Sequence, residues 1–170
     1  MTLAFATHID KAPTYFVEKV WKGLSDLSLV TDSQQAKYFD PADGLMKSSP
    51  YVMDYKVFYK VYPKLHTIRE DSSNRWKVGM DIHMAIRNRS KDRFQFAPIV
   101  KCVSTQTIKI QWATIDLVRM AHITIGGKAL SHSQMDDLAR NDGFDSTGSF
   151  FKWFKEDFEG KIIHWTDLQY

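Results

Sequence analysis

The segment Pro63–Gly79 has the sequence PKLHTIREDSSNRWKVG, and the rest of the chain is interpreted outward from it. If the chain is extended from His66 to Arg69, the side chains of Thr67 and Arg69 point to one face of the strand and that of His66 to the other. Lys64 precedes this strand, directly after the proline. The segment therefore predicts either a site that combines an amine, a hydroxyl and a guanidinium, or a hydrated strand edge.

On both sides of this segment, the spacing of apolar residues predicts a mixture of strands and helices. The apolar residues of 15–27 recur at helical spacing, whereas those of 80–87 alternate with polar ones. By these patterns we expect strands at 2–7, 51–62, 80–87, 94–103, 105–112, 118–125 and 161–168, and helices at 15–27, 133–141 and from residue 145 or 146 to Gly160.

The predicted fold is α+β, with a mostly antiparallel sheet and about three helices. Closing the sheet into a β-barrel is the natural way to remove its edges. A chain of 170 residues predicts one domain, residues 1–170. Residues 28–50 are rich in turn-forming residues and show little periodicity, so 28–62 is interpreted as an insertion before the motif strand.

Composition excludes several classes of protein. The single cysteine, Cys102, cannot form an internal disulfide and favours a reducing compartment. No apolar run approaches the roughly 20 residues that span a bilayer, so we expect a cytoplasmic protein without membrane contact. The net charge of +3 permits contact with phosphates without requiring it.

Several familiar catalytic patterns are missing. The chain has no phosphate-binding loop, nucleophile elbow or zinc-protease motif. Its histidines do not have metal-ligand spacing, and His83, His122 and His164 are interpreted as structural or solvated strand residues. No metal and no cofactor are predicted. Glu18 is expected on a solvated helix face.

Two groups of polar residues remain. A lysine such as Lys64, partly shielded from water, can lose its proton and activate the hydroxyl of Thr67, although spacing alone favours a solvated lysine beside a strand threonine. The second group is a basic cluster, which either binds a phosphate backbone or forms a soluble hairpin tip. Its members are Arg87, Arg89, Lys91 and Arg93.

The strings Lys64–Arg69 and Trp76–Gly79 resemble the signature of the ASCH domain, a relative of the RNA-binding PUA domains. The family pattern is GxKxxExR. This chain matches it at the lysine and at the arginine, departs from it at Tyr62, where glycine is usual, and has Thr67 where many members have glutamate. The resemblance implies a PUA-like β-barrel with a cleft between barrel and helices.

The threonine version of the motif is similar to that of small bacterial ASCH enzymes that remove the acetyl group from acetylated cytidine by means of a lysine, a threonine and a glutamate. By this resemblance Lys64 and Thr67 are the first two catalytic residues, and Asp142, with a shorter side chain, stands where the family has glutamate. Predicted ligand-binding residues are Arg69, His66, Trp76 and Lys77.

The resemblance implies a cleft that binds a nucleoside, a nucleotide or RNA. Three activities stay open: hydrolysis of an amide on a modified nucleoside, RNA binding without catalysis, and ribonuclease activity. The four residues of the basic cluster are the candidates for contact with an RNA backbone.

Overall fold

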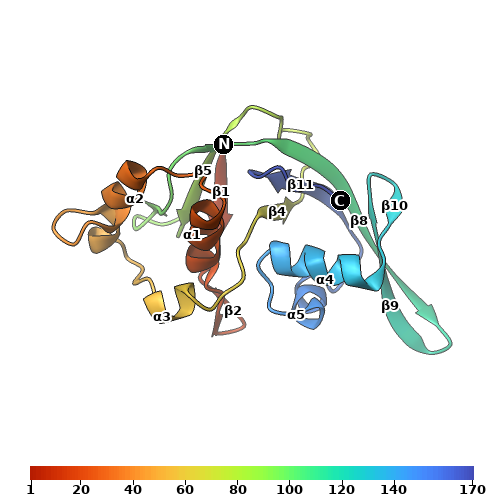
Figure 1. The fold of residues 1–170 in the computed structure, drawn as a ribbon. Helices are drawn as coiled ribbons and strands as arrows, with labels where there is room; N and C mark the ends of the chain where they lie inside the picture. Colours follow the sequence, from red (N-terminus) through yellow and green to blue (C-terminus); the bar gives the residue numbers. More distant parts are fainter. The chain divides into compact units, whose positions relative to one another are not determined.

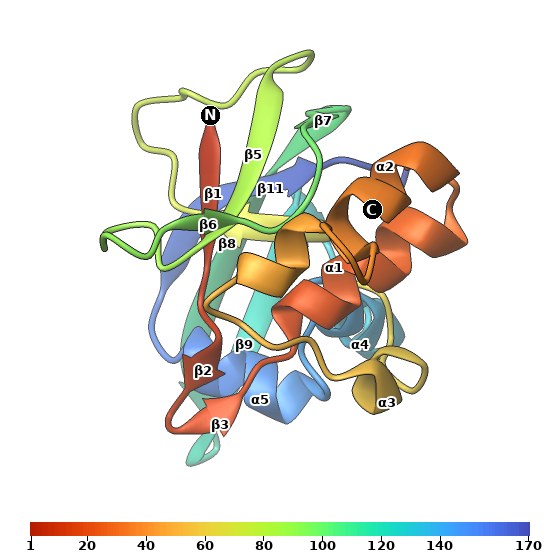
Figure 2. The same cartoon turned by 90° about the vertical axis from the view of Figure 1, so that its left-hand side faces the viewer.

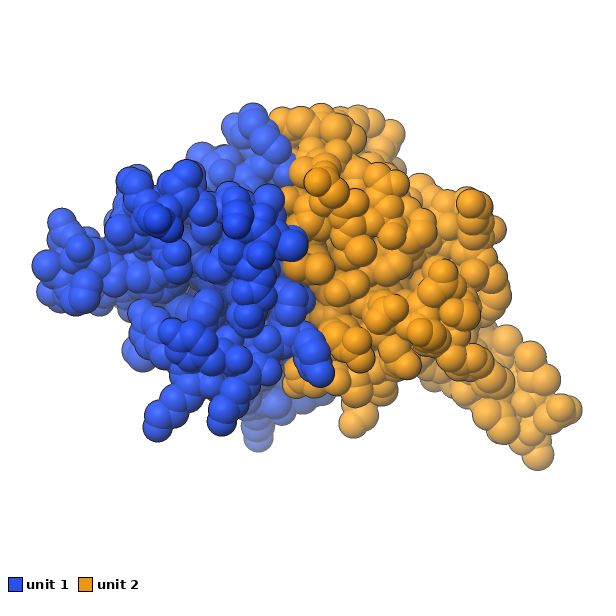
Figure 3. Space-filling model, viewed as in Figure 1, with its two compact units in different colours: residues 1–64, 81–101 blue, residues 65–80, 102–170 orange.

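The computed structural model describes residues 1–170, and the chain divides into two compact units (Figure 3). Unit 1 consists of Met1–Lys64 and Asp81–Lys101, and unit 2 of Leu65–Met80 and Cys102–Tyr170. Figure 1 labels their elements, which are, in chain order, β1 (Thr2–Phe5), β2 (His8–Ile9), β3 (Ala12–Pro13), α1 (Phe16–Asp26), α2 (Asp32–Phe39), the 3-10 helix η1 (Leu45–Ser48), α3 (Tyr55–Phe58), β4 (His66–Arg69), β5 (Asp81–Ile86), β6 (Phe94–Gln95), β7 (Val100–Lys101), β8 (Ser104–Ile115), β9 (Val118–Ile125), β10 (Lys128–Ala129), α4 (His132–Asn141), α5 (Thr147–Trp153) and β11 (Phe158–His164).

Unit 1 is built on a small mixed sheet. Strand β5 pairs in parallel with β1, which Figure 2 shows at its side, and antiparallel with β6 and β7. The predicted strand over 94–103 is interrupted, because β6 ends at Gln95, β7 begins at Val100 and Pro98 lies between them. A proline has no N–H to donate to a strand ladder, which explains this break.

Helix α1 buries its apolar side chains in unit 1, as its spacing predicts. Val20, Trp21 and Leu24 are fully buried, and the Trp21 indole donates to the Phe96 carbonyl at 2.8 Å. Burying each such side chain stabilises the fold by about 1.5–3 kcal/mol. The Glu18 side chain was expected on a solvated helix face, but it is fully buried as well.

The segment 51–62 does not form the predicted strand. Residues Tyr55–Phe58 form the short helix α3, whose N-cap Asp54 accepts the N–H groups of Lys56 and Val57. Buried Glu18 of α1 also binds this segment, because its carboxylate accepts hydrogen bonds from the Tyr51 hydroxyl and the Asp54 N–H. The local bonds of Asp54 and the long-range bonds of Glu18 together override the β propensity of the aromatic and branched residues.

Unit 2 is a five-stranded antiparallel sheet with helices on one face (Figure 1). The strand order is β10-β9-β8-β11-β4. The N-cap residues that precede helices α4 and α5 are Ser131 and Ser146, and each forms a capping box. Their apolar side chains pack on the isoleucines of the sheet, and the buried cluster comprises Ile68, Ile108, Ile110, Ile123, Ile125, Leu130, Met135, Leu138, Ala139, Phe150, Phe154 and Ile162.

The mixed α+β class and the mostly antiparallel pairing are confirmed, and three details differ. No sheet closes into a barrel. The chain forms five α-helices in place of about three, because 28–62 contributes α2 and α3, besides the 3-10 helix η1. The last predicted helix is shorter, since α5 ends at Trp153 and Phe158 already belongs to β11. No helix has the length and apolarity needed to cross a membrane.

Candidate active site

The three residues predicted to be catalytic are all buried. Thr67 lies on β4 with 1% of its surface exposed, and Asp142 caps the C-terminus of α4 with 4% exposed. Lys64 is the last residue of the first segment of unit 1 and is 1% exposed. Buried charged side chains are uncommon and require partners or a function.

Lys64 is enclosed by aromatic rings of unit 1. Its Nζ lies 4.9 Å from the centroid of the Phe16 ring and 5.9 Å from that of Phe5. Its backbone N–H donates to the carbonyl of Lys19 at 2.9 Å. The Lys64 nitrogen therefore lies within cation–π distance of two phenyl rings.

The predicted alternation along β4 is confirmed. His66 and Ile68 lie opposite His164 and Ile162 of β11, and Ile68 belongs to the buried cluster under α4 and α5. Thr67 lies opposite Ile163 and therefore on the other face of the sheet. The threonine hydroxyl is thus separated from the apolar core of unit 2.

Asp142 is brought to β4 by the end of α4. Its Oδ1 accepts the N–H of Ile68, the residue after Thr67, at 3.2 Å. The N–H of Leu65 donates to the Asn141 carbonyl at 2.8 Å. Because β4 is an edge strand, these two acceptors satisfy N–H groups that a further strand would otherwise bind. The helix end therefore places a carboxylate against the backbone of β4, at the residue that follows the predicted nucleophile.

Arg69 adds a cation to the same edge. Its Nη1 donates to the Ile68 carbonyl at 3.0 Å. Burial lowers the pKa of the Arg69 guanidinium, and the negative charge of Asp142 raises it. Since arginine keeps its proton in proteins, the edge of β4 carries one fixed positive and one negative group. Such a pair suits a polar ligand.

His66 belongs to a buried polar cluster that the sequence did not reveal. Its Nε2 lies 2.7 Å from the Tyr170 hydroxyl, and its Nδ1 lies 3.7 Å from Asp142 Oδ1. Asn141 donates to the same hydroxyl at 3.0 Å. Burial raises the pKa of Tyr170, so this phenol stays protonated at neutral pH. No local pattern indicates this cluster, because its members come from opposite ends of unit 2.

His164 lies next to His66 and is fully buried. The two ring centroids are 5.3 Å apart, and neither nitrogen of His164 has a hydrogen-bond partner. Burial lowers the pKa of His164 from 6.5 to about 4. The imidazole is therefore neutral at physiological pH.

The lowered pKa of His164 predicts how stability depends on pH. In the unfolded chain this imidazole binds a proton as the pH falls below 6.5, whereas in the folded chain it does so only near pH 4. Between pH 7 and pH 5 the unfolded state therefore binds more protons, and the free energy of unfolding should fall by up to about 2 kcal/mol. His164→Leu should weaken this dependence and cost little at pH 7, since it removes two unpartnered nitrogens. Urea unfolding at several pH values measures both effects. A wild-type pH dependence in the variant would contradict the prediction; exposed His122→Leu is the matched control.

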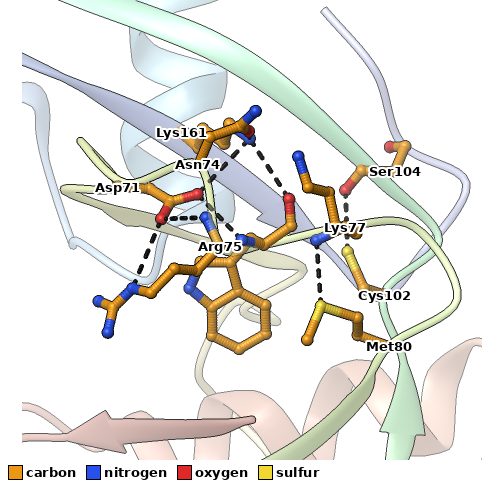
Figure 4. Close-up of polar contacts among 9 residues, drawn as sticks. Asp71, Asn74, Arg75, Lys77, Met80, Cys102, Ser104 and Lys161 are labelled. Carbon is orange, nitrogen blue, oxygen red and sulfur yellow. Dashed lines mark hydrogen bonds and ion pairs between the residues drawn. The ribbon is translucent and has the colours of Figure 1, made fainter.

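The predicted ligand-binding residue Trp76 belongs to a loop that is held by Asp71. Figure 4 shows Asp71 between Arg75 and Lys161. The Asp71 carboxylate accepts the N–H groups of Arg75 at 2.8 Å and Trp76 at 3.0 Å, and lies 3.5 Å from Lys161 Nζ. Trp76 is buried, whereas Lys77 is exposed. Of the two residues, Lys77 is therefore the accessible one.

The basic cluster forms the exposed connection between β5 and β6. Arg87 lies 3.7 Å from Asp92 and donates to the Pro50 carbonyl at 3.3 Å. Arg93 donates to the side chain of Asn88 at 3.1 Å. Arg89 and Lys91 are also exposed, and no ion pair holds them. These two residues are the most available for an external anion.

No protein-family model matches the chain, and neither a curated protein nor a solved structure matches it. The resemblance to the ASCH family therefore depends on its motif residues. The structure brings no three His, Cys, Asp or Glu side chains into a group that could hold a metal ion.

Proposed function

We propose that this chain is an ASCH-type, PUA-like protein that binds a nucleoside or nucleotide and hydrolyses an amide on a modified nucleoside such as acetylated cytidine. One observation supports this assignment above the others. Asp142, predicted as the third catalytic residue, accepts with its carboxylate oxygen the N–H of Ile68, 74 positions earlier and directly after Thr67. A residue selected from one motif thus contacts the backbone of the strand that carries the other motif.

In this proposal the Thr67 hydroxyl attacks the amide carbonyl and forms an ester with the acyl group. The hydroxyl proton passes to the base, which the motif assigns to Lys64, and then to the amine that leaves. Water hydrolyses the ester and releases the acid. Arg69 orients the polar part of the ligand.

The geometry favours a positioning role for Asp142. Its Oδ1 is engaged with the Ile68 amide and lies 3.7 Å from His66 Nδ1. A carboxylate in this position holds the backbone of β4 and compensates the charge of Arg69. The shorter aspartate in place of the family's glutamate agrees with such a role.

Release of acetate from acetylated cytidine tests the proposal directly. We expect turnover by the wild type and loss of turnover in Lys64→Met, which keeps the length of the buried side chain and removes the amine. Lys152→Met is the matched control, because Lys152 is exposed in unit 2 and should not affect the rate. Absence of turnover in a folded wild-type protein, with acetylated cytidine and other acylated nucleosides, would contradict the assignment.

The second candidate is RNA binding without catalysis, and the exposed, unpaired Arg89 and Lys91 favour it. This function requires phosphate contacts, and its affinity should fall with salt. Ribonuclease activity is a weaker alternative. His66 and His164 lie together, but both rings are fully buried and His164 stays neutral.

A further inference from the structure

The segment that follows β11 in unit 2 folds back onto the sheet and fixes the position of Tyr170. The Thr166 hydroxyl donates to the carbonyl of Leu65, directly before β4, at 3.4 Å. On β8, the side chain of Gln106 donates to the Tyr170 carbonyl at 2.9 Å and accepts the Tyr170 N–H at 3.2 Å. Both polar groups of the Tyr170 backbone are therefore bound by one amide side chain, which holds the phenol in a defined place.

The two partners of the Tyr170 hydroxyl determine where its single proton points. The Asn141 side chain donates to this oxygen from Nδ2 at 3.0 Å, and His66 Nε2 lies 2.7 Å from it. Burial raises the pKa of Tyr170, so the phenol keeps its proton at neutral pH. Because a buried hydroxyl that accepts one hydrogen bond donates its proton to the remaining partner, Tyr170 donates to Nε2 of His66.

The hydrogen bond from Tyr170 selects one tautomer of His66. A neutral imidazole carries one proton, and a ring that accepts at Nε2 carries that proton on Nδ1. Nδ1 of His66 lies 3.7 Å from Oδ1 of Asp142. This distance is about 0.5 Å beyond the usual hydrogen-bond range, but in a fully buried site the N–H and the carboxylate still attract each other. The proton of His66 is therefore directed at Asp142.

Two N–H groups of β4 thus act on the same oxygen of Asp142. The backbone N–H of Ile68 donates to Oδ1 at 3.2 Å, and Nδ1 of His66 faces the same atom. The His66 ring is fully buried, and its two nitrogens face Tyr170 and Asp142. A histidine that binds a ligand would have to present one of these nitrogens to it, so the geometry favours a role inside the protein.

We infer that Tyr170 and His66 are positioning residues for the proposed hydrolysis: Tyr170 holds His66 in the Nδ1–H tautomer, and His66 in turn orients the carboxylate of Asp142. Neither residue touches the ligand, and both act through Asp142. The inference rests on the proposed function, and it replaces the assignment of His66 to ligand binding that the motif suggests. It adds Tyr170, which lies about 100 positions from the motif, to the residues on which turnover depends.

Nitrogen-15 NMR of the histidine rings tests the tautomer without reference to activity. The spectrum of His66→Gln identifies the His66 signals among those of the six histidines. In the wild type at pH 7 we expect a proton on Nδ1 and none on Nε2. Tyr170→Phe removes the donor to Nε2 and should shift the resonance of that nitrogen. A proton on Nε2 in the wild type, or an Nε2 resonance that is unchanged in Tyr170→Phe, would overturn the inference.

Kinetics of acetate release from acetylated cytidine separate positioning from ligand binding. Tyr170→Phe should lower kcat by about 10- to 100-fold and leave KM nearly unchanged, because a displaced carboxylate affects the transition state and not the binding of the ligand. Tyr51→Phe is the matched control, since it also removes a hydroxyl that is bound to a buried group, the Glu18 carboxylate, and should leave kcat unchanged. A raised KM with unchanged kcat in Tyr170→Phe would overturn the inference, as would an equal loss of kcat in both variants.

Two amide variants of His66 test which ring nitrogen matters. His66→Asn places an N–H near the position of Nδ1 and keeps a donor toward Asp142, whereas His66→Gln places its amide near Nε2 and keeps only a partner for Tyr170. The asparagine variant should retain more turnover than the glutamine variant, and the reverse order would contradict the inference. Absence of turnover in the wild type contradicts the proposed function, whereas the ring-nitrogen spectrum decides the tautomer by itself, so the two failures are distinguishable.

Discussion

Thr67→Ala is expected to reduce hydrolysis of an acylated nucleoside by on the order of 10⁴-fold or to the uncatalysed rate. The hydroxyl is the only group on this side chain that can form the ester, and no neighbouring side chain on β4 replaces it. Because Thr67 lies on the sheet face opposite the apolar core of unit 2, loss of its hydroxyl should leave the unfolding transition nearly unchanged. Single-turnover acetate release, with circular dichroism to monitor folding, measures both expectations.

Two further variants make the Thr67 result specific. Thr67→Ser keeps a hydroxyl and should retain measurable turnover. Thr105→Ala is the matched control, since Ile163 of β11 lies opposite both Thr67 and Thr105, which places the two threonines in one row of the sheet. A wild-type rate in Thr67→Ala, or an equal loss in Thr105→Ala, would remove Thr67 from the mechanism and leave RNA binding as the better assignment.

Asp71→Ala is expected to lower the free energy of unfolding by about 3 kcal/mol. The substitution removes the acceptor of two backbone N–H groups, those of Arg75 and Trp76, and leaves Lys161 without its carboxylate partner. The Asp71 side chain is fully buried, so water does not replace these contacts without rearrangement of the loop. Chemical denaturation measures the change.

The pKa of Asp71 supplies a second test. Burial alone would raise it, but the N–H groups of Trp76 and Arg75 and the ammonium of Lys161 outweigh burial, and the pKa falls below its ordinary value of 3.8. This carboxylate therefore stabilises the fold above pH 3.8 and loses its contribution as the pH falls below that value. Asp71→Asn should show less loss of stability on acidification than the wild type.

An exposed carboxylate provides the control for Asp71. Asp92 is 48% exposed in its contact with Arg87, and Asp92→Ala should cost less than about 1 kcal/mol. If Asp71→Ala costs no more than Asp92→Ala, the Asp71 loop does not depend on its buried carboxylate.

Local patterns predicted the elements whose apolar spacing is regular. Helix α1, strand β9 and the alternation along β4 follow from the period of their side chains. The same reasoning failed over 51–62, where β-forming residues suggested a strand. There Asp54 caps a helix and Glu18, from another helix, accepts two hydrogen bonds. Such long-range contacts have no periodic signal.

The candidate site shows the same division. The motif around Thr67 indicated a strand with one polar face, and the residues of α4 suggested that Asp142 ends a helix. Neither pattern indicates that Asp142 reaches the Ile68 amide, or that Tyr170 and His164 accompany His66. Those neighbours depend on the register of β11 against β4, which pairs residues about 100 positions apart in the chain.

The sequence by itself determined the α+β class and the strand His66–Arg69, and it supplied the hypothesis for the residues of the candidate site, because periodicity and motif chemistry are local properties. Only the tertiary structure decided that the sheets stay open, that Glu18 is buried and that Arg87 of the basic cluster donates to the Pro50 carbonyl. The physical reason is that edge strands and buried carboxylates are satisfied by whichever donors and acceptors the rest of the chain brings to them. For β4 these come from the end of α4, and for Glu18 from the insertion.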